Sequence, residues 1–214
     1  MCWNEHVSLN TFLFSGFVLG LIIYNNAYTK YKIQELNNIW AYLFFASFIF
    51  MQLIEFFIWR NINNSFYNNV FSIIAVLLLI IQPVISLMNI ANISLRNGLL
   101  LLYILLAVPY SIYKFTTQHI YSMKSEKGHL RWVFFDSTLP LWVIWLFFFF
   151  FSFIYQQQWY GLVFGLIALV VAFLNYKTDH TIGSVWCWSV NSAMIYFAAY
   201  LLFYLPFLEK KEIC

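Results

Sequence analysis

Glu55 is the residue of this sequence best placed to do chemistry, because it is the only carboxylate inside any of the long apolar stretches. It lies in the segment QLIEFFIW (52–59), shortly before Arg60 ends the stretch. An acid inside a membrane-spanning helix costs roughly 2.5 kcal/mol or more unless it is neutral, paired or hydrated, and such acids mark proton and ion pathways. Glu55 is therefore the first candidate for a functional site.

Polar side chains recur at helical spacing on three of the apolar stretches. Residues three and four positions apart share one face of a helix. The three stripes are Gln52, Glu55 and Trp59; Gln82, Ser86 and Asn89; and Ser184, Cys187, Trp188 and Asn191. Pro83 also frees a backbone carbonyl one turn earlier. Three such stripes turned inward would line a hydrated or ligand-filled cavity. The alternative is that these Ser, Asn and Gln side chains tie helices together by interhelical hydrogen bonds.

Most of the other reactive groups fall on one side of the membrane. We call the side that carries the N-terminus face A and the opposite side face B. With seven crossings, face A carries His6, His119, His129, His180, Cys2, Glu5, Asp136, Asp179 and Cys187. We single out His129, which follows the helix-breaking Gly128, because a histidine there could exchange protons with Glu55 near neutral pH. The alternative is that these are ordinary loop residues of a longer and wetter face.

The cysteines leave three alternatives open. Cys2 and Cys187 lie on the same face, and each is flanked by tryptophan. If face A is extracytoplasmic, the two could form a disulfide. If face A is cytoplasmic, they could be metal ligands or a reactive thiol beside His129 or Glu55. The third alternative is a pair of buried apolar cysteines. The sequence has neither a C-x-x-C nor an H-x-x-x-H motif, so a metal site would have to be assembled across helices.

The elements that position these residues are transmembrane helices. Of the 214 residues, 63% are hydrophobic and only 9% are charged, which excludes a soluble domain. The apolar stretches are continuous rather than alternating, which excludes an outer-membrane barrel. We predict an all-α protein, one domain over residues 1–214 with seven transmembrane helices at 9–25, 39–60, 69–93, 98–114, 138–155, 159–175 and 183–208. The expected partner is the lipid bilayer, and nothing indicates nucleic-acid binding.

Further features of the sequence concern the first helix, helix packing, retinal binding and orientation. The first apolar stretch has no preceding basic residue and no cleavage site, so we expect a retained helix. Gly16-x-x-x-Gly20 and Gly161-x-x-x-Gly165 predict close helix packing within the chain or in a homo-oligomer. The seventh stretch contains no lysine, so no retinal Schiff base can form there. Basic residues divide almost evenly between the faces, so the positive-inside rule leaves the orientation open.

The chain resembles a family of small multi-span membrane proteins of unknown function from bacteria and large DNA viruses. The resemblance is carried, in this order, by Met1-Cys2-Trp3 with Ser8, Gln52-x-x-Glu55-x-x-x-Trp59, Gly128-His129-Leu130 with Trp132, and Ser184-Val185-Trp186-Cys187. Where this chain has Met51, the bacterial members often have His. The resemblance implies that Cys2, Glu55, His129 and Cys187 belong to one site, and its basic first loop implies that the N-terminus lies outside. It implies no activity.

These observations lead to three hypotheses for function. The first is a channel or transporter for protons or small cations, with Glu55 as the ion site and the stripe from Gln82 continuing the path. The second is an intramembrane enzyme acting on a lipid or lipid-linked substrate, with Glu55 or His129 as general base and Cys187 or Cys2 as nucleophile or metal ligand. The third is a seven-helix sensor that binds a small molecule other than retinal.

Overall fold

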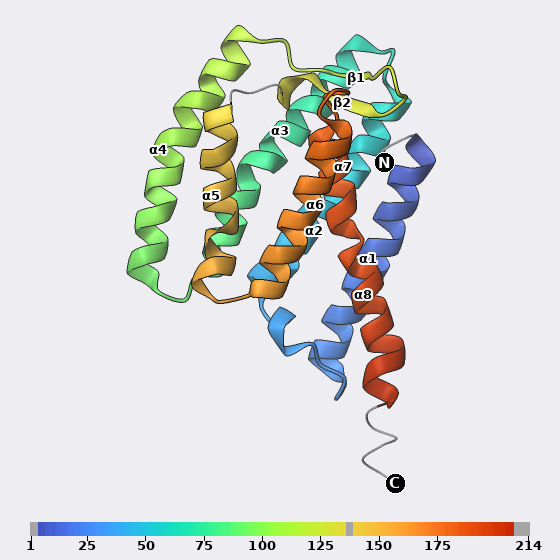
Figure 1. Ribbon diagram of the computed structural model, residues 1–214, viewed down its shortest axis with the longest axis vertical. Coiled ribbons are helices and arrows are strands. Elements are labelled where there is room, and N and C mark those ends of the chain that lie inside the picture. The colour runs from blue at the N-terminus through green and yellow to red at the C-terminus, as the bar shows by residue number, and fades with distance from the viewer. Residues whose placement is uncertain (1–3, 136–138, 208–214) are drawn as a thin grey trace.

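The chain is all-α apart from one small hairpin, as the computed structural model shows (Figure 1). The structure describes residues 4–135 and 139–207. Its long helices are α1 (Glu5–Tyr28), α2 (Ile39–Arg60), α3 (Ser65–Met88), α4 (Ile93–Thr117), α5 (Leu139–Tyr155), α6 (Trp159–Tyr176) and α7 (Ile182–Asn191), which continues through α8 (Ala193–Ala199) into the π-helical turn η3 (Tyr200–Tyr204). Two short 3₁₀ turns are η1 (Gln34–Leu36) and η2 (Val133–Phe135).

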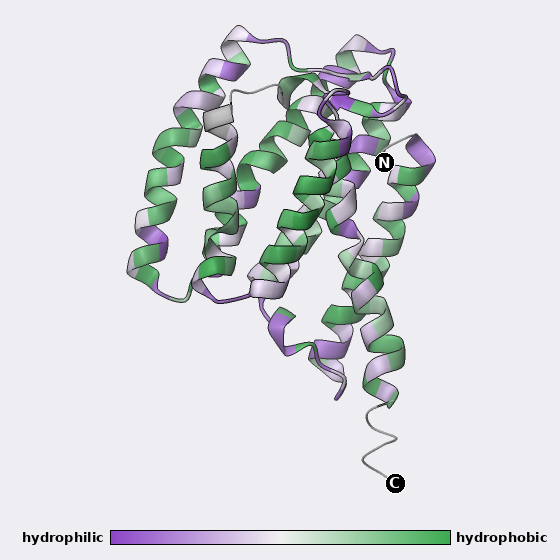
Figure 2. Cartoon of the chain, in the orientation of Figure 1, coloured by the Kyte–Doolittle hydropathy of each residue, from purple (hydrophilic) through white to green (hydrophobic). Residues whose placement is uncertain are grey.

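Among the described residues, six helical segments are long and apolar enough to cross a membrane: α1, α2, α3, α4, α6 and the continuous segment from Ile182 to Phe207. The helix α5 is shorter, with 17 residues. Figure 2 shows hydrophobic residues along the helices and hydrophilic ones gathered at the helix ends and in the hairpin. The all-α class that the sequence predicts is therefore confirmed.

Asparagine caps move several helix ends away from the predicted positions. The third and fourth helices were expected at 69–93 and 98–114, but they begin four and five residues earlier, at Ser65 and Ile93. The side chain of Asn64 accepts a hydrogen bond from the backbone N–H of Tyr67, and that of Asn92 accepts one from Leu95. Such caps pair the N–H groups that a helix start leaves free. Hydropathy averages over these polar caps, so it placed both starts too late.

The helix α2 is central to the bundle. It packs against α1, α3 and α7, while α5 packs against α3, and α4 lies at one edge (Figure 1). Face A corresponds to the top of Figure 1. At this end lie the starts of α1, α3 and α7 and the ends of α2, α4 and α6. At this end Glu5 and Arg60 approach to 3.8 Å and join α1 to α2.

Within the connection predicted between the helices at 98–114 and 138–155, residues 122–132 form a β-hairpin at face A. Its strands β1 (Ser122–Lys124) and β2 (Leu130–Trp132) are antiparallel, with Met123 opposite Arg131. Gly128 has a φ of 87°, a left-handed conformation that glycine adopts without strain, and it allows the chain to reverse. Leu130 and Trp132 are buried. The hairpin therefore packs onto the helices as a cap rather than extending into solvent.

The second glycine pair, Gly161 and Gly165, allows close helix packing within the chain. A methyl group added at Gly161 would lie 2.9 Å from the ring of Phe153, and one added at Gly165 would lie 2.9 Å from the ring of Phe150. These glycines therefore let α6 approach the phenylalanines of α5. In the first pair, Gly16 faces Ile49 at 3.9 Å, whereas Gly20 has nothing within 4 Å.

Candidate functional site

Glu55 lies in the interior of the bundle, as expected, with no exposed surface. The amide nitrogen of Gln52, one turn earlier on α2, donates a hydrogen bond of 3.0 Å to its Oε2. Cys187 of α7 is also fully buried, has a free thiol and lies within electrostatic range of Glu55. The structure thus brings together the carboxylate and the thiol that the sequence places 132 positions apart.

Further buried polar groups lie on α1 and α7, the helices that pack against α2 beside α3. We call Ser8, Ser15, Gln52, Glu55, Trp59 and Asn191 the Glu55 set. Within the described part of the chain, five of its atoms are buried without a hydrogen-bond partner: the hydroxyl oxygens of Ser8 and Ser15, the amide oxygens of Gln52 and Asn191, and the indole nitrogen of Trp59. Each such group costs about 1–3 kcal/mol. A concentration of them is typical of sites that bind water or an ion.

The stripe on α1 was missed by the sequence analysis, although its spacing was visible. Ser8, Thr11 and Ser15 are separated by three and four residues, the same pattern that identified Gln52 and Glu55. Thr11 shows where the stripe points, because its hydroxyl accepts a hydrogen bond of 3.1 Å from the indole of Trp188 on α7. The stripe therefore faces the same side of the interior as the polar residues of α7.

The residues predicted on α7 divide between two roles. Asn191 donates to the backbone carbonyl of Phe48 at 3.2 Å and so ties α7 to α2. Ser184 instead donates to the carbonyl of Leu130 at 2.7 Å and holds the hairpin against the start of α7. Ser184 is thus an anchor of the cap.

The stripe on α3 forms a second polar set, directed toward α5. We call Gln82, Ser86, Asn89, Ser152 and Gln156 the Gln82 set. The hydroxyls of Ser86 and Ser152 lie 2.7 Å apart, Gln156 donates to the backbone carbonyl of Asn89, and Asn89 accepts from the capping residue Asn38 at 3.3 Å. Gln82 is fully buried, and its side chain has no hydrogen-bond partner among the described residues. Ser86 and Asn89 of this stripe therefore pair with Ser152 and Gln156, whereas one cavity lined by all three stripes stays a prediction.

A cluster of aromatic residues is hydrogen-bonded to both sets through its backbone. Phe48, whose carbonyl is bound by Asn191, packs its ring against that of Phe149, with 5.8 Å between centroids. The carbonyl of Phe149 in turn accepts the hydroxyl of Ser86 at 2.6 Å. Phe44 and Trp186 complete the cluster, at 5.2 and 5.5 Å from Phe149. We call these four rings the aromatic barrier, since Asn191 of one set and Ser86 of the other bind the backbone carbonyls of two of its residues.

His129 lies inside the cap and is 7% exposed, so it is not an exposed loop histidine. Its ring packs edge-on against Tyr176 at the end of α6, with centroids 5.2 Å apart. Its backbone N–H donates to the hydroxyl of Ser125, which donates to the carboxylate of Asp179 at 2.7 Å. Burial lowers the pKa of His129, an effect that Lys127 reinforces and Asp179 opposes. Proton exchange between His129 and Glu55 stays a prediction.

Other predicted groups are not gathered at a site. His6, His119 and His180 are exposed. Cys2 and Asp136 lie outside the described residues, so the disulfide or metal role of Cys2 stays a prediction. Within residues 4–135 and 139–207, no group of three or more His, Cys, Asp or Glu side chains is placed to hold a metal ion.

A cavity of about 180 Å³ lies elsewhere, between α3, α4 and α5, and was not anticipated from the sequence. It is lined by none of Glu55, His129 and Cys187.

Comparison with family models, with curated proteins and with solved structures found no match to this chain.

Proposed function

We propose that this chain moves protons or small cations across a membrane and that Glu55 is its intramembrane carboxylate site. The observation that carries the proposal is the complete burial of Glu55, bonded to Gln52, on the helix α2 against which α1 and α7 pack with buried polar side chains of their own. Carboxylates at such depth belong to ion paths and proton relays in membrane proteins. The hydroxyl and amide oxygens of Ser8, Ser15 and Asn191 are groups that bind water and hard cations.

The two polar sets supply the two halves of a path. The Glu55 set belongs to the face A half, because Glu55 lies about one and a half turns from the face A end of α2. The Gln82 set runs from the buried Gln82 through Ser86 to the half-buried Asn89 and the exposed Asn38 at face B. An ion that leaves Glu55 would next meet polar groups in the Gln82 set, after it has passed the aromatic barrier.

The aromatic barrier is the gate in this proposal. Hydrophobic constrictions in channels and transporters stop ions by excluding water. Phe48 and Phe149 are 1–2% exposed and pack against each other and against Trp186. Joining the two halves requires these rings to move, so the conformation described here is the closed one.

The proposal also includes the topology. We infer that α5 is the seventh crossing, because its 17 residues extend over about 26 Å, which is close to the hydrocarbon thickness of a thin bilayer. We infer further that face A lies outside. Lys30 and Lys32, in the connection between α1 and α2, would then lie on the cytoplasmic side, the orientation that the basic first loop implies through the family resemblance.

The geometry supports transport better than lipid chemistry. An enzyme that acts on a lipid has to bring the substrate chain to its general base or nucleophile. The apolar cavity, where such a chain would fit, is lined by residues of α3, α4 and α5, and none of Glu55, His129 and Cys187 is among them.

Flux measurements in liposomes test the proposal. Purified protein is reconstituted with an enclosed pH-sensitive dye, and proton, Na⁺ and K⁺ gradients are imposed in turn. We expect flux in the wild-type protein and a fall to the level of protein-free liposomes in Glu55→Gln, which keeps the shape of the side chain but removes its charge. Glu35→Gln is the matched control, because Glu35 is exposed on η1. Absence of any flux in folded wild-type protein would refute the proposal.

A further inference from the structure

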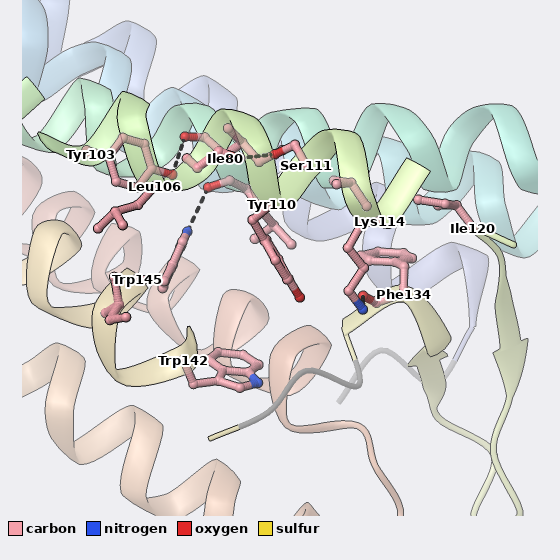
Figure 3. A pocket seen from close by; sticks show the side chains of 14 residues that line it. Ile80, Tyr103, Leu106, Tyr110, Ser111, Lys114, Ile120, Phe134, Trp142 and Trp145 are labelled. Atoms are coloured by element: carbon pink, nitrogen blue, oxygen red, sulfur yellow. Dashed lines mark hydrogen bonds between the residues drawn. The ribbon is translucent and has the colours of Figure 1, made fainter. Parts of the chain in front are cut away.

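The cavity between α3, α4 and α5 has the form of a chain-binding site (Figure 3). Its volume is about 180 Å³, and its lining on α4 runs from Tyr103 through Leu106 and Tyr110 to Lys114. At the rise of an α-helix, these eleven steps extend over about 16 Å. The length of the lining favours an extended hydrocarbon chain over a compact ligand.

Two of the aromatic residues that line the cavity direct their polar groups to backbone carbonyls. The hydroxyl of Tyr103 donates to the backbone carbonyl of Ile80 at 2.8 Å, and the indole of Trp145 donates to that of Leu79 at 3.0 Å (Figure 3). The hydroxyl of Ser111 likewise donates to Ala107 on its own helix at 2.6 Å. Since these donors are bound to carbonyls of α3 and α4, the rings of Tyr103 and Trp145 present hydrocarbon to the cavity.

One end of the cavity is cationic. Lys114 carries the only charge among the described side chains that line it, and this residue is only 7% exposed. Its ammonium group is positioned by the amide oxygen of Gln118 at 2.7 Å and the backbone carbonyl of Phe134 at 3.2 Å. Lys114 lies in the last turn of α4, at the depth where lipid headgroups meet a transmembrane helix.

We propose that this cavity binds one acyl chain of an anionic phospholipid from the face A leaflet, with the headgroup phosphate at Lys114. The apolar, elongated body fits the chain, and the single cation at its outer end fits the phosphate. The site is separate from Glu55 and does not depend on the proposed transport.

Native mass spectrometry of the purified full chain tests the site. The protein is titrated with phosphatidylglycerol and with phosphatidylcholine that carry the same acyl chains. We expect the wild type to prefer phosphatidylglycerol, and Lys114→Gln to bind it roughly tenfold more weakly, the loss expected for a hydrogen bond to a charged group. Lys177→Gln is the matched control, because Lys177 also lies at face A beside an aromatic ring, that of Phe173, but outside the cavity. Equal binding of both lipids by the wild type would overturn the proposal.

A second variant tests the acyl chain independently of the charge. Ala107→Phe adds a ring to the cavity wall and keeps Lys114, so it should weaken the binding of phosphatidylglycerol. Soluble glycerol phosphate, which has the headgroup chemistry without a chain, should not displace the lipid. Displacement by glycerol phosphate, or full lipid binding by folded Ala107→Phe, would show that the cavity does not hold the chain.

Discussion

Trp145 of α5 donates its indole N–H to the backbone carbonyl of Leu79 in α3, with 3.0 Å between the two atoms. Pro83 lies four residues after Leu79 and has no N–H, so α3 cannot pair this carbonyl itself. An unpaired carbonyl is costly in hydrocarbon. The expectation that Pro83 frees a carbonyl one turn earlier is therefore confirmed, and Trp145 is the residue that occupies it.

The hydrogen bond from Trp145 to Leu79 predicts that substitutions at Trp145 and Pro83 have coupled effects on the free energy of unfolding. Trp145→Phe should lower the free energy of unfolding by about 1–3 kcal/mol, because it removes the donor and leaves the carbonyl of Leu79 unpaired. The loss should be smaller in a Pro83→Ala background, since alanine restores the N–H within α3. Unfolding of the four proteins of this double-mutant cycle in mixed micelles measures the coupling. An equal loss in both backgrounds would mean that Trp145 acts through packing alone.

The aromatic barrier predicts a gain of flux. Phe48→Leu replaces a ring that contacts Phe149 and Trp186 by a smaller side chain, so it should raise proton flux severalfold while costing about 1–3 kcal/mol of stability. Phe57→Leu on the same helix is the control, because Phe57 is 36% exposed and lies outside the barrier. Adding Glu55→Gln to Phe48→Leu should abolish the extra flux. A leak that persists in the double variant would place the path elsewhere.

The buried His129 predicts a pH dependence of stability. Its pKa in the folded protein is lowered by burial from the ordinary value of 6.5, so the unfolded chain binds more protons between the two values. The stabilisation is full above the ordinary pKa and is lost as the pH falls through this window. Unfolding should therefore be easier at about pH 5.5 than at about pH 7.5. His129→Gln should reduce this difference, whereas substitution of the exposed His119 should not.

The glycines predict opposite outcomes for the same change. Gly165→Ala should destabilise the protein by about 1–3 kcal/mol, because the added methyl group lies 2.9 Å from the Phe150 ring, which is itself packed against Trp186. Gly20→Ala meets nothing within 4 Å and should be neutral or stabilising by up to about 1 kcal/mol through helix propensity. Thermal unfolding in detergent compares the two. Equal effects would contradict the tight contact between α5 and α6.

The sequence by itself determined the helical class and the interior position of Glu55. Continuous apolar stretches allow only helices, because every backbone group in lipid has to be paired within its own segment. A carboxylate in such a stretch avoids lipid, and Glu55 is indeed fully buried. Spacing of three and four residues also identified the polar faces of α2 and α3 correctly, since that spacing follows from helix geometry alone.

Only the tertiary structure decided which polar faces meet. Ser86 pairs with Ser152 rather than with the residues around Glu55, because α5 lies against α3 on that side. The folding of residues 122–132 into a cap depends on contacts far along the chain, such as the bond from Ser184 to Leu130. Helical periodicity fixes the direction of a side chain within its own helix and carries no information on the neighbouring helix. That choice depends on the packing of the whole bundle.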